Sequence, residues 1–153
     1  MRRVRVRSCA WSGVWTGTRA RGCRFAEIDV DGARTGVYLE HFTYDSTFRR
    51  LWVGPDVRVG LTAEWAAPDS GGEPASVGNV IEDSRFESRL VGVYLDEGTR
   101  RTTVRRSTFV NQQWAAIGDY RGSGNAYYAN DYRGIDAGAA AVSHDHLTSF
   151  REG

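Results

Sequence analysis

The chain has no lysine, only three prolines and two cysteines, and no long apolar run. Its 20 basic residues are all arginines scattered among 19 acids, so no stripe of positive charge would follow a nucleic-acid backbone, and we expect no nucleic-acid partner. No stretch approaches the roughly 20 apolar residues that span a bilayer, and arginines interrupt the region after Met1 where a signal peptide would be apolar. We therefore expect a soluble chain without a membrane partner. Its compartment stays open, because a longer protein with a leader would be extracellular.

Cysteine and helix-forming patterns are also scarce. Cys9 and Cys23 form neither a CxxC pair nor a metal-ligand spacing, which leaves two interpretations open, buried free thiols or a mutual disulfide. No segment of a dozen residues keeps a helical period, whereas glycine is abundant at 18 residues. The 153 residues therefore favour one all-β domain over residues 1–153, which could be a fragment of a longer chain.

What the chain does contain is a repeated five-residue word. It reads GVYLE at 36–40 and GVYLD at 92–96, and weaker copies stand at 60–64 and 115–119. The steps between starting positions are 24 (36 to 60), 32 (60 to 92) and 23 (92 to 115) residues. Repeats of this size cannot bury their own apolar faces and gain a core only by stacking. The sequence thus predicts a solenoid of about six turns.

Apolar residues alternate with polar ones between glycine-containing breaks, which predicts three short strands per turn. Stacked equivalent strands would be parallel, about 4.8 Å apart. The three predicted inward columns are Val4, Ala20, Phe48, Ile81, Val104 and Tyr127; Cys9, Phe25, Val53, Phe86, Phe109 and Tyr132; and Val14, Val37, Leu61, Val93 and Ala116. Two stretches should fall outside the repeat, an inserted loop near 66–76 and a non-repeating C-terminal wrap near 135–153.

With this pattern, clearest in the turns at 84–95 and 107–119, the chain resembles the right-handed parallel β-helices of the pectate-lyase-like superfamily. The resemblance covers roughly residues 20–135 and implies the handedness of the coil. It also implies chemistry, because the superfamily includes lyases that use carboxylate-bound calcium and a basic residue, and hydrolases that use clustered aspartates. Since its pattern is a rhythm of apolar positions, it supports a fold more than an activity.

Two charged rows alternate in sign from turn to turn. One consists of Arg49, Glu82 and Arg105, and the other of Arg50, Asp83 and Arg106. Side chains in a stacked repeat face their equivalents one strand away, so alternating signs compensate each other. We predict a structural ladder here, in which an exposed pair contributes under about 1 kcal/mol.

One column does not compensate itself. The repeated words end in Glu40, Glu64, Asp96 and Asp119, which we expect to point outward from one sheet. Like charges about 4–5 Å apart repel by roughly 1 kcal/mol even in water, so such a column favours a bound partner. The residues that flank these acids are mostly aromatic, namely Tyr38, Tyr94, His41, Trp65 and Tyr120. Rings beside carboxylates on an elongated sheet suit a polysaccharide, whose sugar faces stack on rings while its hydroxyls bond to acids.

The sequence therefore predicts a carbohydrate-active β-helix that binds an extended polysaccharide along this column. Glu64 and Asp96 are the candidate catalytic residues, and the other acids and their neighbours, Glu40, Asp119, Tyr38, Tyr94, His41, Trp65 and Tyr120, are the candidate substrate-binding residues. Whether the chain cleaves or epimerises its ligand stays open, because the acid spacing fits both retaining and inverting hydrolases. There is no lysine to act as a lyase base, although the resemblance implies that an arginine can take that role.

Calcium would suit adjacent carboxylates, but the sequence identifies no complete ligand set. His144 and His146 have metal-ligating side chains without a third ligand in sight. The alternative function is a non-catalytic structural or interaction module. In that case the aromatic rows stack only on each other, and nearby arginines neutralise the acids.

Overall fold

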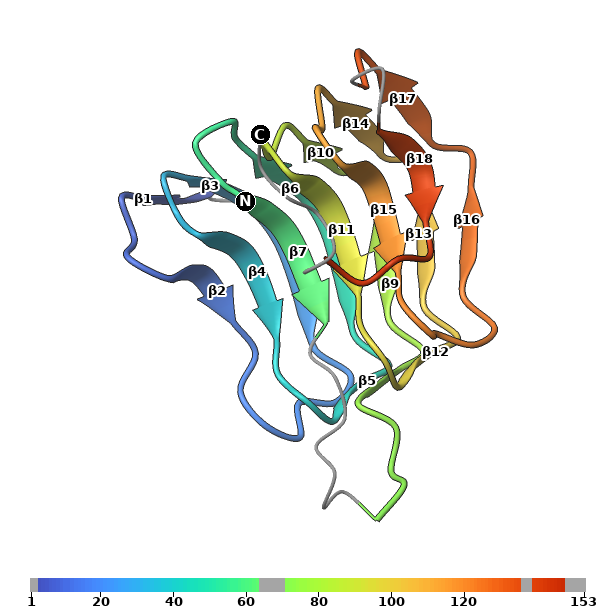
Figure 1. Ribbon diagram of the computed structural model, residues 1–153. Coiled ribbons are helices and arrows are strands. Elements are labelled where there is room, and N and C mark those ends of the chain that lie inside the picture. Colours follow the sequence, from blue (N-terminus) through green and yellow to red (C-terminus); the bar gives the residue numbers. More distant parts are fainter. Residues whose placement is uncertain (1–2, 64–70, 136–138, 148–153) are drawn as a thin grey trace.

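The computed structural model describes residues 3–63, 71–135 and 139–147. Within these ranges the chain forms a parallel β-solenoid with 18 strands and no α-helix (Figure 1). This confirms the predicted all-β solenoid. It makes about five turns instead of six.

The strands form three sheets, all of whose strand pairs are parallel. Sheet A contains β1 (Val4–Arg7), β3 (Arg24–Asp31), β6 (Thr47–Val53), β9 (Val80–Glu82), β10 (Arg85–Phe86), β13 (Thr103–Arg105), β14 (Thr108–Val110), β16 (Ala126–Tyr128) and β17 (Asp131–Arg133). Sheet B, across the front of Figure 1, contains β2 (Ser12–Trp15), β4 (Thr35–Leu39), β7 (Val59–Ala63), β11 (Val91–Leu95), β15 (Ala115–Asp119) and β18 (Ala140–Ser143). Sheet C contains β5 (Thr43–Tyr44), β8 (Ser76–Val77) and β12 (Thr99–Arg100).

Two stretches expected to lie outside the repeat are partly described. β18 falls within the predicted C-terminal wrap, yet it pairs in register with β15 and so continues sheet B. The first part of the predicted insertion, 66–70, lies outside the described residues. In its second part, Glu73 and Pro74 each accept a 2.8 Å hydrogen bond from the Tyr44 hydroxyl, which ties the loop to sheet C.

The core consists of apolar columns that run from turn to turn. The observed columns are Phe25, Phe48, Ile81, Val104 and Tyr127; Val6, Val30, Val53, Phe86, Phe109 and Tyr132; and Val14, Val37, Leu61, Val93, Ile117 and Val142. The two predicted sheet A columns are confirmed from Phe48 and Val53 onward. The predicted earlier members are wrong. The sequence predicted Ala20 and Phe25 as the two core positions of their turn, whereas the structure uses Phe25 and Val30. Both pairs are five residues apart, so the spacing alone does not distinguish them.

Each pass through sheet A bends at a residue in the left-handed backbone region. These residues have φ between 48° and 59° and are Glu27, Arg50, Asp83, Arg106 and Ala129. The amide after the bend donates to a side chain of the next turn, as from Ser84 N to Ser107 Oγ (3.2 Å) and from Ser107 N to Asn130 Oδ1 (3.0 Å). A buried polar column thus satisfies amides that the bend removes from the backbone ladder.

Sheet B has a glycine at the second position of each central strand. The ladder pairs the residues on either side of Gly36, Gly60 and Gly92 but skips the glycine itself. A Cβ on Gly60 would lie under 3.0 Å from the carbonyl oxygen of Gly92 and from the Phe86 ring. The glycines therefore allow the two sheets to approach each other closely.

Both cysteines, Cys9 and Cys23, are free thiols, and both are partly buried. This agrees with the first of the two interpretations, although neither thiol is fully enclosed. None of the described residues belongs to a helix that could cross a membrane.

Candidate functional site

The charged rows on sheet A form the predicted ion-pair ladder. Asp83 accepts hydrogen bonds from Arg49 Nε (2.9 Å) and Arg106 Nε (2.8 Å), and Glu82 accepts them from Arg105 Nε (2.8 Å) and Arg106 Nη2 (2.7 Å). Burial alone would raise the pKa of Glu82, but the bonds from Arg105 and Arg106 outweigh it and lower that pKa. The hydrogen bond from Arg106 is the main cause that lowers the pKa of Asp83. Through these bonds the two acids link three turns. Their carboxylates are already occupied by arginine side chains.

The acidic column on sheet B is shorter than predicted. Leu95 of β11 pairs with Asp119 of β15, so Asp119 stands one residue out of line with Asp96, and Tyr120 takes the corresponding position. The alignment of Asp119 with the other three acids is therefore wrong. The acid at the end of the word 115–119 suggested that alignment, whereas the register is set by Ile117 packing beside Val93.

Asp119 lies inside the last turn and not on the outer face. Only 7% of it is exposed, and its carboxylate accepts hydrogen bonds from the Tyr127 hydroxyl and from Asn125 Nδ2 (3.2 and 3.3 Å). Burial and the bond to Asp119 raise the pKa of Tyr127. The outward placement on which its predicted substrate-binding role depended is thus absent, and Asp119 closes the end of the core.

The remaining acids of the column have separate surroundings. Glu64 and its neighbour Trp65 lie outside the described residues. Glu40 follows β4 and accepts a 3.0 Å hydrogen bond from Trp15 Nε1. Asp96 follows β11, and burial raises its pKa, although the Glu97 amide (2.8 Å) and nearby His146 act in the opposite direction.

Of the predicted aromatic flanks, Tyr94 and Tyr120 lie beneath residues 144–147. We call residues 144–147 the C-terminal strap; in Figure 1 this segment leaves β18 and crosses in front of β15 and β11. The His146 ring packs edge-on against Tyr120 (4.7 Å between ring centroids) and Tyr94 (6.4 Å), and Tyr94 is only 3% exposed. His41 lies elsewhere, edge-on to Phe42 at 5.1 Å.

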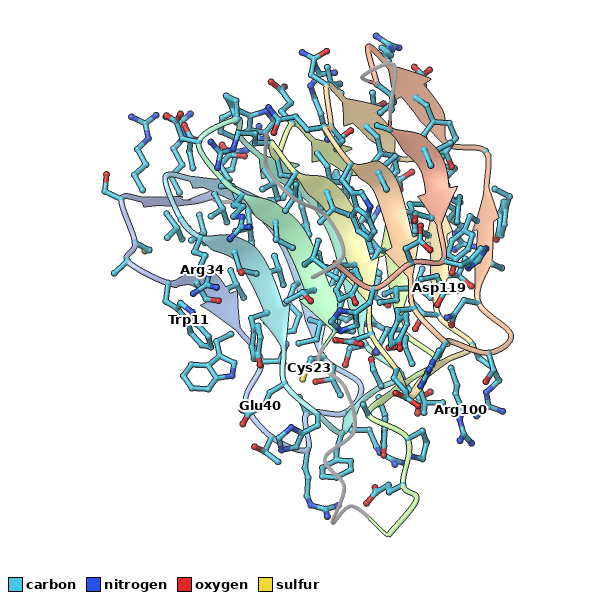
Figure 2. The ribbon with its side chains drawn as sticks, viewed as in Figure 1. Trp11, Cys23, Arg34, Glu40, Arg100 and Asp119 are labelled. Carbon is cyan, nitrogen blue, oxygen red and sulfur yellow. The ribbon has the colours of Figure 1, made fainter. Side chains whose placement is uncertain are left out.

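Over β4 and β7, beyond the described end of the strap, sheet B contains a groove of about 470 Å³. Its lining residues are Trp11, Arg34, Thr35, Tyr38, Arg58, Val59, Thr62 and Leu147. Tyr38 and Thr62 belong to the outward row identified from the sequence, whereas Trp11, Arg34 and Arg58 were missed. Figure 2 shows Trp11 and Arg34 together over β2 and β4, with Asp119 on the opposite side of the view.

Three aromatic rings form an exposed cluster beside this groove. Trp11 lies 5.9 Å from Trp15 and 5.1 Å from Tyr38 between ring centroids, and 6.3 Å separates Trp15 from Tyr38. Trp11 is 46% exposed and Trp15 is 58% exposed. Large rings gathered in contact with solvent mark a binding surface more often than a structural one. The two tryptophans four residues apart were the sequence signal that could have located it.

The described residues contain no group of three or more His, Cys, Asp and Glu side chains arranged to hold a metal ion. No family model, curated protein or solved structure matches this chain. Membership of the pectate-lyase-like superfamily is therefore not shown. The groove and the aromatic residues beside it are therefore the candidate functional site.

Proposed function

We propose that the protein binds a polysaccharide through the sheet B groove. The observation that carries this proposal is the exposed cluster of Trp11, Trp15 and Tyr38 on a rigid sheet, with polar side chains at hydrogen-bonding range of the same surface. The groove volume falls within the roughly 300–1,000 Å³ usual for small-ligand sites.

Each part of the surface has a role in this proposal. The tryptophan rings stack on the apolar faces of sugars, because they offer large rigid area at small entropic cost. Glu40 accepts hydrogen bonds from sugar hydroxyls with the lone pairs that Trp15 leaves unused. Arg34 donates from the opposite side of the groove, and Thr62 provides a hydroxyl on its floor.

Catalysis is a separate proposal, and Asp96 with Glu64 remains its candidate pair. A general acid needs a carboxyl group that keeps its proton near the working pH, and burial raises the pKa of Asp96 in that direction. The predicted structural module is the competing function. It requires that no glycan binds the aromatic cluster.

Glycan-array screening followed by calorimetry tests the binding proposal. We expect Trp15→Ala to lower the affinity for the glycans retained by the array at least about tenfold, which corresponds to roughly 1.4 kcal/mol. Tyr128→Ala is the matched control, because Tyr128 is similarly exposed (49%) but belongs to sheet A. Equal affinity of Trp15→Ala and the wild type would exclude the aromatic cluster, on which the proposal rests, as the binding surface.

A further inference from the structure

We propose that the groove takes the end of a glycan chain and not its interior. This inference rests on the proposed glycan binding and concerns how the ligand fits. It starts from an asymmetry of sheet B among the described residues, because the C-terminal strap covers β11 and β15 and does not extend over β2 and β4.

The covered half is closed by several contacts of the C-terminal strap. His144 Nδ1 lies 3.1 Å from the backbone oxygen of Asp119, and the amide of Leu147 donates to the Tyr94 hydroxyl at 3.3 Å. Between these points the His146 ring packs edge-on against two tyrosines. The strap is thus attached to sheet B at both ends and in the middle.

Beneath the strap lies a second apolar cluster, separate from the solenoid core. Its buried members are Val59, Leu90, Val91, Tyr94, Trp114 and Ala115, and Leu147 packs against them. Trp114 is only 8% exposed here, in contrast to Trp11 and Trp15 at the uncovered end. A glycan cannot reach the rings of Tyr94 and Trp114 while this packing is in place.

Leu147 belongs both to this cluster and to the lining of the groove. The point where the strap meets the sheet is therefore also the closed end of the groove. The row Tyr38–Thr62 crosses from β4 to β7, and neighbouring strands are about 4.8 Å apart, so the open floor covers only about 10 Å from β2 to β7. A ligand that follows this row toward β11 must end at Leu147.

The sides of the groove direct the ligand along the same row. Trp11, Arg34 and Arg58 precede paired residues of β2, β4 and β7, so they occupy equivalent positions on adjacent turns and line one side. Tyr38 and Thr62, which are paired in β4 and β7, form the neighbouring row of the lining. A chain that enters from the β2 end therefore has one exit blocked.

Binding stoichiometry distinguishes chain ends from chain interiors. The probes are size-fractionated short, medium and long fragments prepared from xylan, β-glucan and polygalacturonate, chosen by the array result. With the wild-type protein we expect the number of molecules bound per chain to stay constant as the fragments lengthen. A number that grows with chain length would overturn end recognition while leaving glycan binding intact. Absence of binding to every probe would overturn the proposed function, and this inference with it.

Release of the strap provides the second test. The double variant Tyr94→Phe and His146→Ala removes the hydrogen bond at Leu147 and the central ring contact, with Tyr128→Phe as a control for loss of a tyrosine hydroxyl. Hydrogen exchange over residues 144–147 confirms that the strap has opened and that β11 has not. We then expect binding per chain to increase with fragment length. Unchanged stoichiometry with an open strap would show that the strap does not close the groove.

Discussion

At the residue scale, the solenoid depends on side chains in an unfavourable backbone region. Glu27, Arg50, Asp83 and Arg106 occupy the left-handed bend of sheet A without glycine's freedom, at a cost of about 1–2 kcal/mol each. All four offset part of this cost through ion pairs with other turns. Ala129 occupies the equivalent position with φ of 55° and has only a methyl group.

We therefore expect Ala129→Gly to stabilise the protein by about 1 kcal/mol, because glycine adopts positive φ without a steric penalty. Urea denaturation followed by circular dichroism measures this. Ala126→Gly is the control, since Ala126 lies within β16 and glycine there should destabilise. A lower unfolding midpoint for Ala129→Gly would show that the bend does not strain alanine.

At the scale of the strand, the glycine at the second position of β4, β7 and β11 allows sheet B to approach sheet A closely. The sequence contains this feature as the first letter of the repeated word, but its role could not be deduced without the register. In β15 the equivalent position is Ala116, so at that turn the space accommodates a methyl group.

Gly60→Ala should accordingly destabilise by about 1–3 kcal/mol or more, because the added methyl group meets the Gly92 carbonyl and the Phe86 ring. The reverse change in β15, Ala116→Gly, should cost no more than about 1 kcal/mol. Chemical denaturation of both variants provides the comparison. Similar losses of stability in the two variants would contradict the close approach of the two sheets at Gly60.

The pattern of core residues within the strands determined how much of the fold could be predicted from the sequence. The sequence predicted the sheet A columns correctly from Phe48 onward, because each of these turns has two aromatic or β-branched core residues five positions apart. The long insertion is the only interruption of this pattern. The groove could not be found this way. Trp11 lies in the first turn, where the spacing differs, and Arg34 precedes the repeated word. The alignment of Asp119 was predicted wrongly because it relied on the acid at the end of the repeated word. The apolar residue Ile117, which pairs with Val93, sets the register instead.

At the scale of the molecule, the sheet A ion pairs connect strands of three successive turns, β6, β9 and β13. Glu82 has a lowered pKa in the folded state, relative to about 4.5 for the free side chain. The stability it contributes is therefore present above pH 4.5 and is lost as the pH falls through the folded pKa.

Thermal unfolding across pH checks this linkage. We expect the melting temperature of the wild type to exceed that of Glu82→Gln at neutral pH, and the difference to shrink steadily below about pH 4.5. Glu97→Gln is a suitable control, because Glu97 is largely exposed and its one described ion pair, with Arg121, is long at 3.6 Å. A constant difference across the acidic range would exclude the charge of Glu82 as the cause.

The strap also affects the order in which the molecule can assemble. Register partners in the solenoid lie about one turn apart in the chain, so each turn can add to the previous one as it emerges during synthesis. The contact of Leu147 with Tyr94 joins residues 53 positions apart. Because long loops close more slowly than short ones, the strap should be the last part to form. A nascent chain would therefore display the full length of sheet B, including Tyr94 and Trp114, until residue 147 has been synthesised.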